Sequence, residues 1–268
     1  MKVLKFGGTS VGTPSRMKEV RQIISRDDDR KIVVLSAVSG TTNALVALSN
    51  KHERQDRQGT EVLLKELYEK YVTFVKELYE TDKYREAGQK VVDKYFSVLK
   101  EYLSEPFSKS LAKAIVVQGE MISTNLFINY LAEHGDDAAL IDAADYMTIN
   151  ESHEPDLHLI EEKLKNILSN HANRRTLITQ GFICRNASGE IDNLKRGGSD
   201  YSATLIAAAI GADEAQIWTD IDGMHNNDPR IVESTFPIAE LSFDEAGELA
   251  YFGAKILHPN CIIPAQLK

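Results

Sequence analysis

The first 35 residues contain two short apolar segments separated by an amphipathic one. The second segment, Lys31-Ile32-Val33-Val34-Leu35, has no polar residue after its first position, which is typical of a strand buried on both faces of a parallel sheet. The first segment, residues 2–6, reads as a shorter strand. Between them, apolar residues recur at helical spacing over residues 14–25, and Pro14 suits a helix start. Strand, helix and strand in this order predict a βαβ unit.

The rest of the chain continues the alternation. Further strands are predicted at residues 138–142, 175–179 and 216–219, with a hairpin turn at 189–191. Helices are predicted at about 43–48, 59–80, 83–103, 108–132 (interrupted at 118–120), 157–170, 199–210 and 243–251. We expect an α/β fold, a three-layer αβα sandwich around a largely parallel sheet. Residues 51–105 have no strand-like run and are expected to form a helical excursion whose charges lie on a solvated face.

The charge and the cysteine content limit the classes of binding partner and the kinds of site that this chain can have. The 31 Lys and Arg residues against 40 Asp and Glu residues give a formal net charge of −9, which argues against nucleic acid or an anionic membrane as the main partner. Cys184 and Cys261 are too few for a disulfide framework or a thiolate metal site. No segment approaches the roughly 18 apolar residues of a membrane span. We therefore expect a cytoplasmic protein with one large domain or two small ones.

Four loops that follow predicted strands are rich in Gly, Ser and Thr: residues 7–10, 36–42, 180–186 and 196–200. Ligands of open α/β sheets bind at the carboxyl ends of the strands, where glycines let backbone N–H groups approach an anion. Together these loops predict a phosphate site, although each alone is equally explained by packing. The chain lacks a Walker A loop, a dinucleotide G-x-G-x-x-G motif and the protein-kinase motifs, so the site belongs to another architecture.

Three charged residues stand out beside these loops. Lys5 ends the first predicted strand and is either a surface residue or a point charge for β- and γ-phosphates. Arg196 precedes two glycines and suits bidentate binding of a carboxylate. Asp200 either complements the dipole of the helix at 199–210 or orients Lys5. Ser199 is expected to cap this helix and Gly211 to end it.

Five motifs, in order and spacing, resemble those of aspartokinases, which belong to the amino acid kinase superfamily. They are Lys5-Phe6-Gly7-Gly8-Thr9-Ser10, Gln118-Gly119-Glu120, Arg196-Gly197-Gly198-Ser199-Asp200-Tyr201, Trp218-Thr219-Asp220 and Phe252-Gly253-Ala254-Lys255-Ile256-Leu257-His258-Pro259. The resemblance covers residues 5 to about 264. The N-terminal motif is most similar to the kinase half of bifunctional aspartokinase–homoserine dehydrogenases.

The resemblance implies the amino acid kinase fold and phosphorylation of L-aspartate by ATP to 4-phospho-L-aspartate, the first step toward lysine, threonine and methionine. It implies catalytic roles for Lys5, which would contact the transferring phosphoryl group, and Asp200, which would position Lys5. Substrate binding would fall to Arg196 for the α-carboxylate, to Glu120 for the ammonium, and to Ser36, Thr42, Phe182 and Ser199. Nucleotide binding would fall to Gly7, Gly8, Thr219, Asp220, His225, Arg230 and Lys255.

The same resemblance implies Mg²⁺ bound mainly by phosphate oxygens and water, with no metal site made by the chain. His153, His158 and His258 fit no standard zinc spacing and are expected to be structural. Two positions depart from the family pattern: His225 stands where tyrosine is usual in the nucleotide loop, and Lys195 stands where glycine is common.

The resemblance also divides the chain. Residues 1–180 would form an amino-acid-binding lobe and residues 181–268 a shortened nucleotide-binding lobe, without the ACT domains that follow in relatives. Relatives are commonly dimers or larger, so a homo-oligomer is one expected state. Two alternatives stay open: a superfamily kinase for glutamate, N-acetylglutamate, carbamate or a nucleotide, and a non-catalytic module that binds nucleotide or amino acid. Glu120 favours a free α-amino group over an acylated one.

Overall fold

The computed structural model describes residues 1–195, 197–228, 231–252 and 259–266. The first half contains β1 (Lys2–Phe6), α1 (Pro14–Ile24), β2 (Lys31–Leu35), α2 (Thr41–Glu53), α3 (Arg57–Leu78), α4 (Asp82–Ser104), α5 (Lys109–Val116) and α6 (Gln118–Glu133). The second half contains β3 (Ala138–Leu140), α7 (Ala143–Tyr146), α8 (Leu157–Asn170), β4 (Thr176–Gln180), β5 (Ile183–Arg185), β6 (Ile191–Asn193), α9 (Gly198–Ile210), β7 (Glu214–Trp218), α10 (Phe243–Phe252), the 3₁₀ turn η1 (Pro259–Cys261) and α11 (Ile262–Gln266).

Five of the strands form one parallel sheet in the order β3-β4-β2-β1-β7. Lys5 pairs in register with Val34 on one side and Ile217 on the other. It therefore lies in an interior strand of the sheet, near the carboxyl ends of the strands. A small antiparallel pair, β5 and β6, lies apart from this sheet. The predicted βαβ start and hairpin are therefore confirmed.

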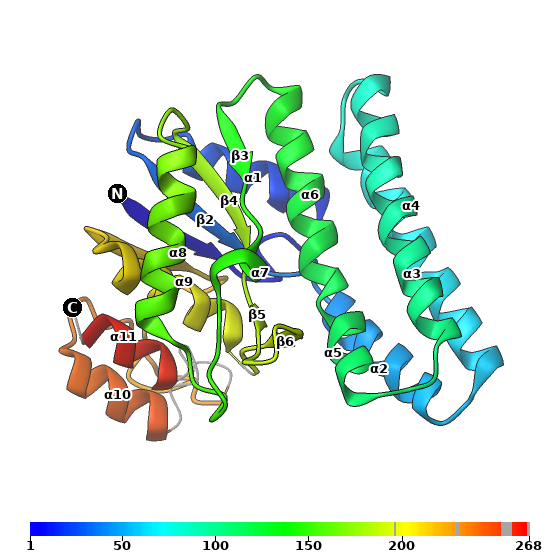
Figure 1. Ribbon diagram of the computed structural model, residues 1–268. Helices are drawn as coiled ribbons and strands as arrows, with labels where there is room; N and C mark the ends of the chain where they lie inside the picture. Colours follow the sequence, from blue (N-terminus) through cyan, green and yellow to red (C-terminus); the bar gives the residue numbers. More distant parts are fainter. Residues whose placement is uncertain (196, 229–230, 253–258, 267–268) are drawn as a thin grey trace.

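Alternate side chains of the strands enter two separate cores. Phe6 and Val33 pack with helices α1, α3, α4 and α6, whereas Val3 and Ile32 pack with α8 and α9. Because successive strand residues point to opposite faces, this alternation places a helical layer on each side of the sheet (Figure 1). The αβα sandwich predicted from the sequence is confirmed.

Helices α3 and α4 form a long pair that stands beside the sheet and packs through α4 on α6 (Figure 1). Buried aromatic residues hold the pair together, and Tyr68 and Tyr71 both lie edge-on to Phe96. Tyr79, near the end of α3, donates a hydrogen bond to the carbonyl of Leu126 in α6 at 2.7 Å. The helical excursion is thus anchored to the helix that carries Glu120.

Several expected elements differ in detail. The helix predicted at 108–132 is two helices that meet at Val117, and strand β3 ends at Leu140 rather than at residue 142. Strand β7 begins two residues earlier than expected, at Glu214. The sequence prediction missed α7, η1 and α11, which have only three to five residues each and therefore no helical periodicity. Among the described residues, no helix is long and apolar enough to cross a membrane.

Lys31 is a buried cation at the start of β2, only 2% exposed. Its Nζ donates to the carbonyl of Ile24 at 2.7 Å and to Oδ1 of Asp27 at 2.6 Å. Ile24 ends α1, so the ammonium satisfies a carbonyl in the last turn and complements the helix dipole. Hydrogen bonding, first of all to Lys31, lowers the pKa of Asp27 to about 2.

Replacing Lys31 with methionine is expected to lower the free energy of unfolding by about 1–3 kcal/mol, because it removes charged hydrogen bonds from a buried site. Urea titration followed by circular dichroism would measure the loss. Lys65→Met is the matched control, since the side chain of Lys65 is 76% exposed. An equal loss in both variants would show that the buried contacts of Lys31 are not stabilising.

Candidate active site

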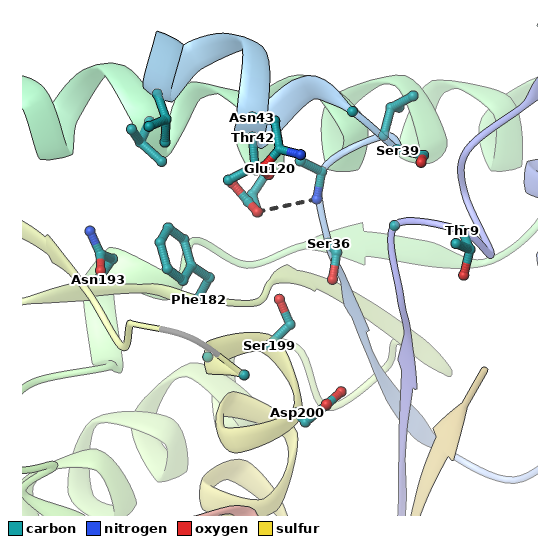
Figure 2. Close-up of a pocket in the computed structure, with 18 of the residues that line it drawn as sticks. Thr9, Ser36, Ser39, Thr42, Asn43, Glu120, Phe182, Asn193, Ser199 and Asp200 are labelled. Carbon is teal, nitrogen blue, oxygen red and sulfur yellow. Dashed lines mark hydrogen bonds between the residues drawn. The ribbon is translucent and has the colours of Figure 1, made fainter. Parts of the chain in front are cut away.

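A cavity of about 710 Å³ lies at the carboxyl ends of β1 and β2. Its walls are the loops after these strands, the first turn of α6, the segment before α9 and the N-terminus of α9 (Figure 2). It brings together eight residues that the sequence assigns to catalysis or binding: Lys5, Gly8, Ser36, Thr42, Glu120, Phe182, Ser199 and Asp200. Residues at the ends of β1, β2 and β4 and at the starts of α2, α6 and α9 therefore converge on one cavity.

Lys5 and Asp200 form an ion pair at the floor of this cavity. Lys5 Nζ lies 2.6 Å from Asp200 Oδ1, and the two side chains are 11% and 17% exposed. Asp200 is in the first turn of α9, so the carboxylate holds the ammonium at the point where β1 ends. The contact that the sequence predicts between these residues is present, and the lysine is a fixed cation at the edge of an open space.

The two glycines after β1 permit close packing around Lys5. A Cβ atom on Gly7 would lie 3.1 Å from Lys5 Nζ, and one on Gly8 would lie 3.1 Å from the carbonyl oxygen of Ala37. Both approaches are tighter than a side chain ordinarily allows. Gly8 itself lines the cavity, whereas Gly7 lies beside the lysine that does.

Glu120 is the buried acid on the opposite side of the cavity (Figure 2). It is 3% exposed, and its Oε1 accepts a hydrogen bond from the backbone N–H of Ala37 at 3.2 Å. Its Oε2 has no hydrogen-bond partner among the described residues. Burial raises the pKa of Glu120 to about 8. A buried carboxylate oxygen without a partner is costly, and a bound cationic group would satisfy it.

Gly119 lets α6 approach the loop after β2. A Cβ atom there would lie 2.8 Å from Ala37 Cβ and 3.2 Å from Thr41 Cγ2. Gly119→Ala is therefore expected to displace the neighbouring Glu120 and to lower kcat/KM by about tenfold or more, as overpacking of a close contact does. Steady-state kinetics would measure the loss. Gly247→Ala is the control, because a Cβ atom on Gly247 would meet nothing within 4 Å; full activity in both variants would contradict the prediction.

Phe182 and Lys195 have left-handed backbone conformations near this cavity, with φ of 70° and 60°. Neither residue type favours that region. The backbone of Phe182 is held by Ser202 Oγ, which accepts from its N–H at 2.9 Å, and by the N–H of Leu194, which donates to its carbonyl at 2.8 Å. Phe182 thereby becomes a fixed aromatic wall. The positive φ of Lys195 explains why glycine is common there in the family that the sequence resembles.

Ser199 lines the cavity but does not cap α9, which corrects the sequence prediction. The N-cap is Gly197, with φ of 73° and no side-chain cap. Ser199 sits inside the first turn, close against Gly181, where a Cβ atom would lie 2.6 Å from its Oγ. Gly211 does end the helix, in the predicted left-handed conformation.

The residues predicted to hold nucleotide are more dispersed. Thr219 and Asp220 line a separate cavity of about 340 Å³, next to Trp218 and Ser10. His225 lines neither cavity: its ring is in hydrogen-bond contact with Asp222 Oδ1 at 2.6 Å and with a threonine hydroxyl at 3.0 Å. Nucleotide contact by His225 stays a prediction. Arg196, Arg230 and Lys255 lie outside the described residues.

Sequence reasoning missed several polar residues of the main cavity. Their positions are Thr9, Ser39, Asn43 and Asn193. Thr9 and Ser39 lie in two of the loops singled out above, and Asn43 is in the first turn of the helix that follows the second loop, so a signal existed for all three. Asn193 ends β6, and only the position of the hairpin brings it to the cavity.

A family model described as the amino acid kinase family matches residues 1–268. Lysine-sensitive aspartokinase 3 of Escherichia coli is 36% identical over 266 residues, which cover 98% of this chain and 58% of that protein. A bifunctional aspartokinase/homoserine dehydrogenase of Haemophilus influenzae is 33% identical over 274 residues, covering 98% of this chain and 33% of that protein. The chain thus spans little more than half the length of the first relative and a third of the second.

Solved structures agree with these sequence matches. The crystal structure of E. coli aspartokinase III in complex with aspartate and ADP superposes with a TM-score of 0.88 at 36% identity, covering 100% of this chain and 60% of that one. The aspartate kinase of Clostridium acetobutylicum gives 0.79 at 26% identity, covering 100% and 57%. An isopentenyl phosphate kinase, at 12% identity and a TM-score of 0.51, shares the fold alone. By sequence and fold together, the chain belongs to the amino acid kinase family.

Proposed function

We propose that this chain is the catalytic domain of an aspartokinase, which transfers the γ-phosphoryl group of ATP to the β-carboxylate of L-aspartate. The observation that carries the proposal is Glu120, a buried carboxylate with one unpartnered oxygen on the wall of the cavity that contains Lys5. An α-ammonium group would both donate to that oxygen and balance the charge of the carboxylate, whereas an acylated nitrogen has one N–H donor and no charge. The similarity to aspartokinases over 98% of the chain supports the same substrate.

The chemistry requires positioning more than proton transfer. A β-carboxylate with a pKa of about 3.9 is ionised at neutral pH, so it needs no general base. The difficulty is the approach of this anion to the triphosphate. Lys5, held by Asp200 at 2.6 Å, would neutralise charge on the transferring phosphoryl group, and backbone N–H groups of the loops after β1 and β2 would add donors.

ATP would enter as its Mg²⁺ complex. Among the described residues, no three His, Cys, Asp or Glu side chains gather in a way that could bind a metal ion. Asp200 is already paired with Lys5. The donor set therefore fits a cation bound by phosphate oxygens and water rather than by the protein. We also propose that Thr219 and Asp220 bind the nucleotide, with Arg196 on the substrate carboxylate and Arg230 and Lys255 on the phosphates.

Coupled ADP release with Mg·ATP and each of L-aspartate, L-glutamate and N-acetyl-L-glutamate would test the proposal. Hydroxylamine should trap the acyl phosphate as a hydroxamate in the aspartate reaction only. Turnover with another acceptor and none with aspartate would overturn the assignment. Binding of ATP and aspartate by calorimetry without any ADP release would instead identify a non-catalytic module.

A further inference from the structure

The loop between β2 and α2, residues 36–40, and the first turn of α2 lie where the substrate cavity meets the glycines after β1. Ser36, Ser39 and Thr42 line the cavity, as Figure 2 shows for all three. A Cβ atom on Gly12 would lie 3.0 Å from Ser39 Cβ. Ser39 therefore packs closely against the segment that follows the glycines beside Lys5.

Two backbone N–H groups of this loop are available to a ligand. Within the described residues, the N–H groups of Ser39 and Gly40 donate no hydrogen bond. Gly40 is the N-cap of α2, with φ of 79° and no side-chain cap. Free N–H groups at this position favour an anion, provided that the loop is held still.

The start of the loop is held by α6. Ser123 Oγ donates to the carbonyl of Ser36 at 2.7 Å, and Glu120 accepts from the N–H of Ala37. These contacts come from the helix that carries a predicted substrate residue. They fix the first two residues of the loop, and they do not hold its second half.

The second half is held by α3, a helix of the excursion. Lys70 Nζ donates to the carbonyl of Ser39 at 2.6 Å, and the hydroxyl of the next residue, Tyr71, lies 2.9 Å from Thr41 Oγ1 in a fully buried contact. The lysine ammonium is also close to Gly40, where a Cβ atom would lie 3.7 Å from Nζ. Lys70 thus binds the carbonyl of the Ser39–Gly40 peptide, the same peptide group that carries the free N–H of Gly40.

We propose that Lys70 is a positioning residue for phosphoryl transfer. Its ammonium binds the carbonyl of Ser39 and fixes the orientation of that peptide group. The N–H groups of Ser39 and Gly40 then point toward the transferring phosphoryl group. This inference rests on the proposed function of the cavity. It makes the helical excursion a support of the active site, whereas the sequence assigns its charges to solvent.

Loss of this contact should affect the rate more than the fold. Without Lys70 the loop is still tied by Ser123 and Tyr71, so only the segment around Ser39 gains freedom. Positioning is worth most in the transition state, where charge on the phosphoryl oxygens is redistributed. A variant should therefore lose kcat while its KM for aspartate changes little.

The test compares Lys70→Met with Lys70→Arg and with Lys76→Met, an exposed lysine on the same helix. We expect kcat to fall about tenfold in Lys70→Met, with KM for aspartate within about threefold of wild type. Arginine keeps the charge and should restore kcat to within about threefold. Equal rates in the two methionine variants, or no recovery with arginine, would overturn the proposal.

Hydrogen exchange of the substrate-free protein separates this inference from the proposed function. The amides of Thr41 and Ala44, which donate to the carbonyls of Val38 and Gly40, should exchange about tenfold faster in Lys70→Met, as the loss of a nearby charged hydrogen bond implies. In Lys76→Met they should exchange at the wild-type rate. If wild type has no aspartate-dependent turnover, the proposed function fails, and the exchange rates still decide whether Lys70 holds the loop. Unchanged exchange in Lys70→Met would show that it does not.

Discussion

Replacing Lys5 with alanine is expected to lower turnover about a thousandfold or more while the protein stays folded. Lys5 lines the cavity at the end of β1, and Asp200 fixes its ammonium at 2.6 Å. Charge moves onto the phosphoryl oxygens during transfer, so a fixed cation there acts mainly in the transition state. The loss should therefore appear in kcat, measured by coupled ADP release.

Two variants make this test specific. Lys165→Ala removes an exposed lysine from α8 and should leave the rate unchanged. Asp200→Asn keeps the shape but weakens the hold on Lys5, so a smaller loss of roughly 10- to 100-fold is expected. Circular dichroism and thermal melting would confirm that each variant is folded. A Lys5→Ala protein that retains the wild-type rate would remove Lys5 from the mechanism.

Glu120→Gln is expected to weaken aspartate binding about a hundredfold or more, because the amide has the same shape but no charge for the α-ammonium group. Affinity for Mg·ATP should change little. Calorimetry with each ligand would separate the two effects, with Glu66→Gln, an exposed position on α3, as the control. Equal aspartate affinity in Glu120→Gln and wild type would place the ammonium elsewhere.

The raised pKa of Glu120 gives this test a pH signature. With a pKa of about 8 in the ligand-free protein, the side chain is mostly protonated at pH 6, and an ammonium group prefers its ionised form. Aspartate affinity of the wild type should therefore rise up to tenfold per pH unit between about pH 6 and pH 8 and then level off. Glu120→Gln should lack this rise, and a parallel pH dependence in the two proteins would contradict the assignment.

Stability should change in the opposite direction. The folded-state pKa of Glu120 lies above the ordinary value of 4.5, so the native state binds the proton more tightly than the unfolded chain does. The resulting contribution to the free energy of unfolding is complete below pH 4.5. It is lost as the pH rises to about 8, by at most about 1.4 kcal/mol per pH unit. At pH 8.5 the ligand-free Glu120→Gln variant should melt above wild type, which thermal melting at pH 5 and pH 8.5 would show.

Most of the fold could be predicted from local pattern. The apolar run at residues 31–35 and the helical periodicity of residues 59–80 and 83–103 each fix an element without knowledge of its neighbours, and the structure contains all three. The N-cap of α9 was wrong for a physical reason: serine is a good cap in isolation, but here Gly197 takes the left-handed conformation that turns the chain into the helix. Helix α7 is too short to show a period.

The site was predictable to the extent that its residues lie at strand ends. Lys5 and Ser36 could be expected together because the carboxyl ends of parallel strands meet at one edge, whereas Asp200 was expected beside Lys5 from its place at the start of a helix after a glycine-rich loop. Asn193 and Lys70 could not, since their positions depend on how the β5–β6 hairpin and the α3–α4 pair pack against that edge. Lys70 is exposed in the structure as well, and only its hydrogen bond to the carbonyl of Ser39 distinguishes it from an ordinary solvated lysine.

The order of the strands has a consequence for how the chain is made. Strand β1, which precedes every other described element, pairs with β2 and with β7, and the backbone N–H of Asp213 donates to the carbonyl of Met1. One edge of β1 must therefore wait for more than two hundred residues of further synthesis before it finds its partner, a separation that slows folding. During that interval Lys5 has neither Asp200 nor β7 beside it. A nascent chain released before β7 would expose the unpaired edge of β1, the kind of surface that chaperones must protect.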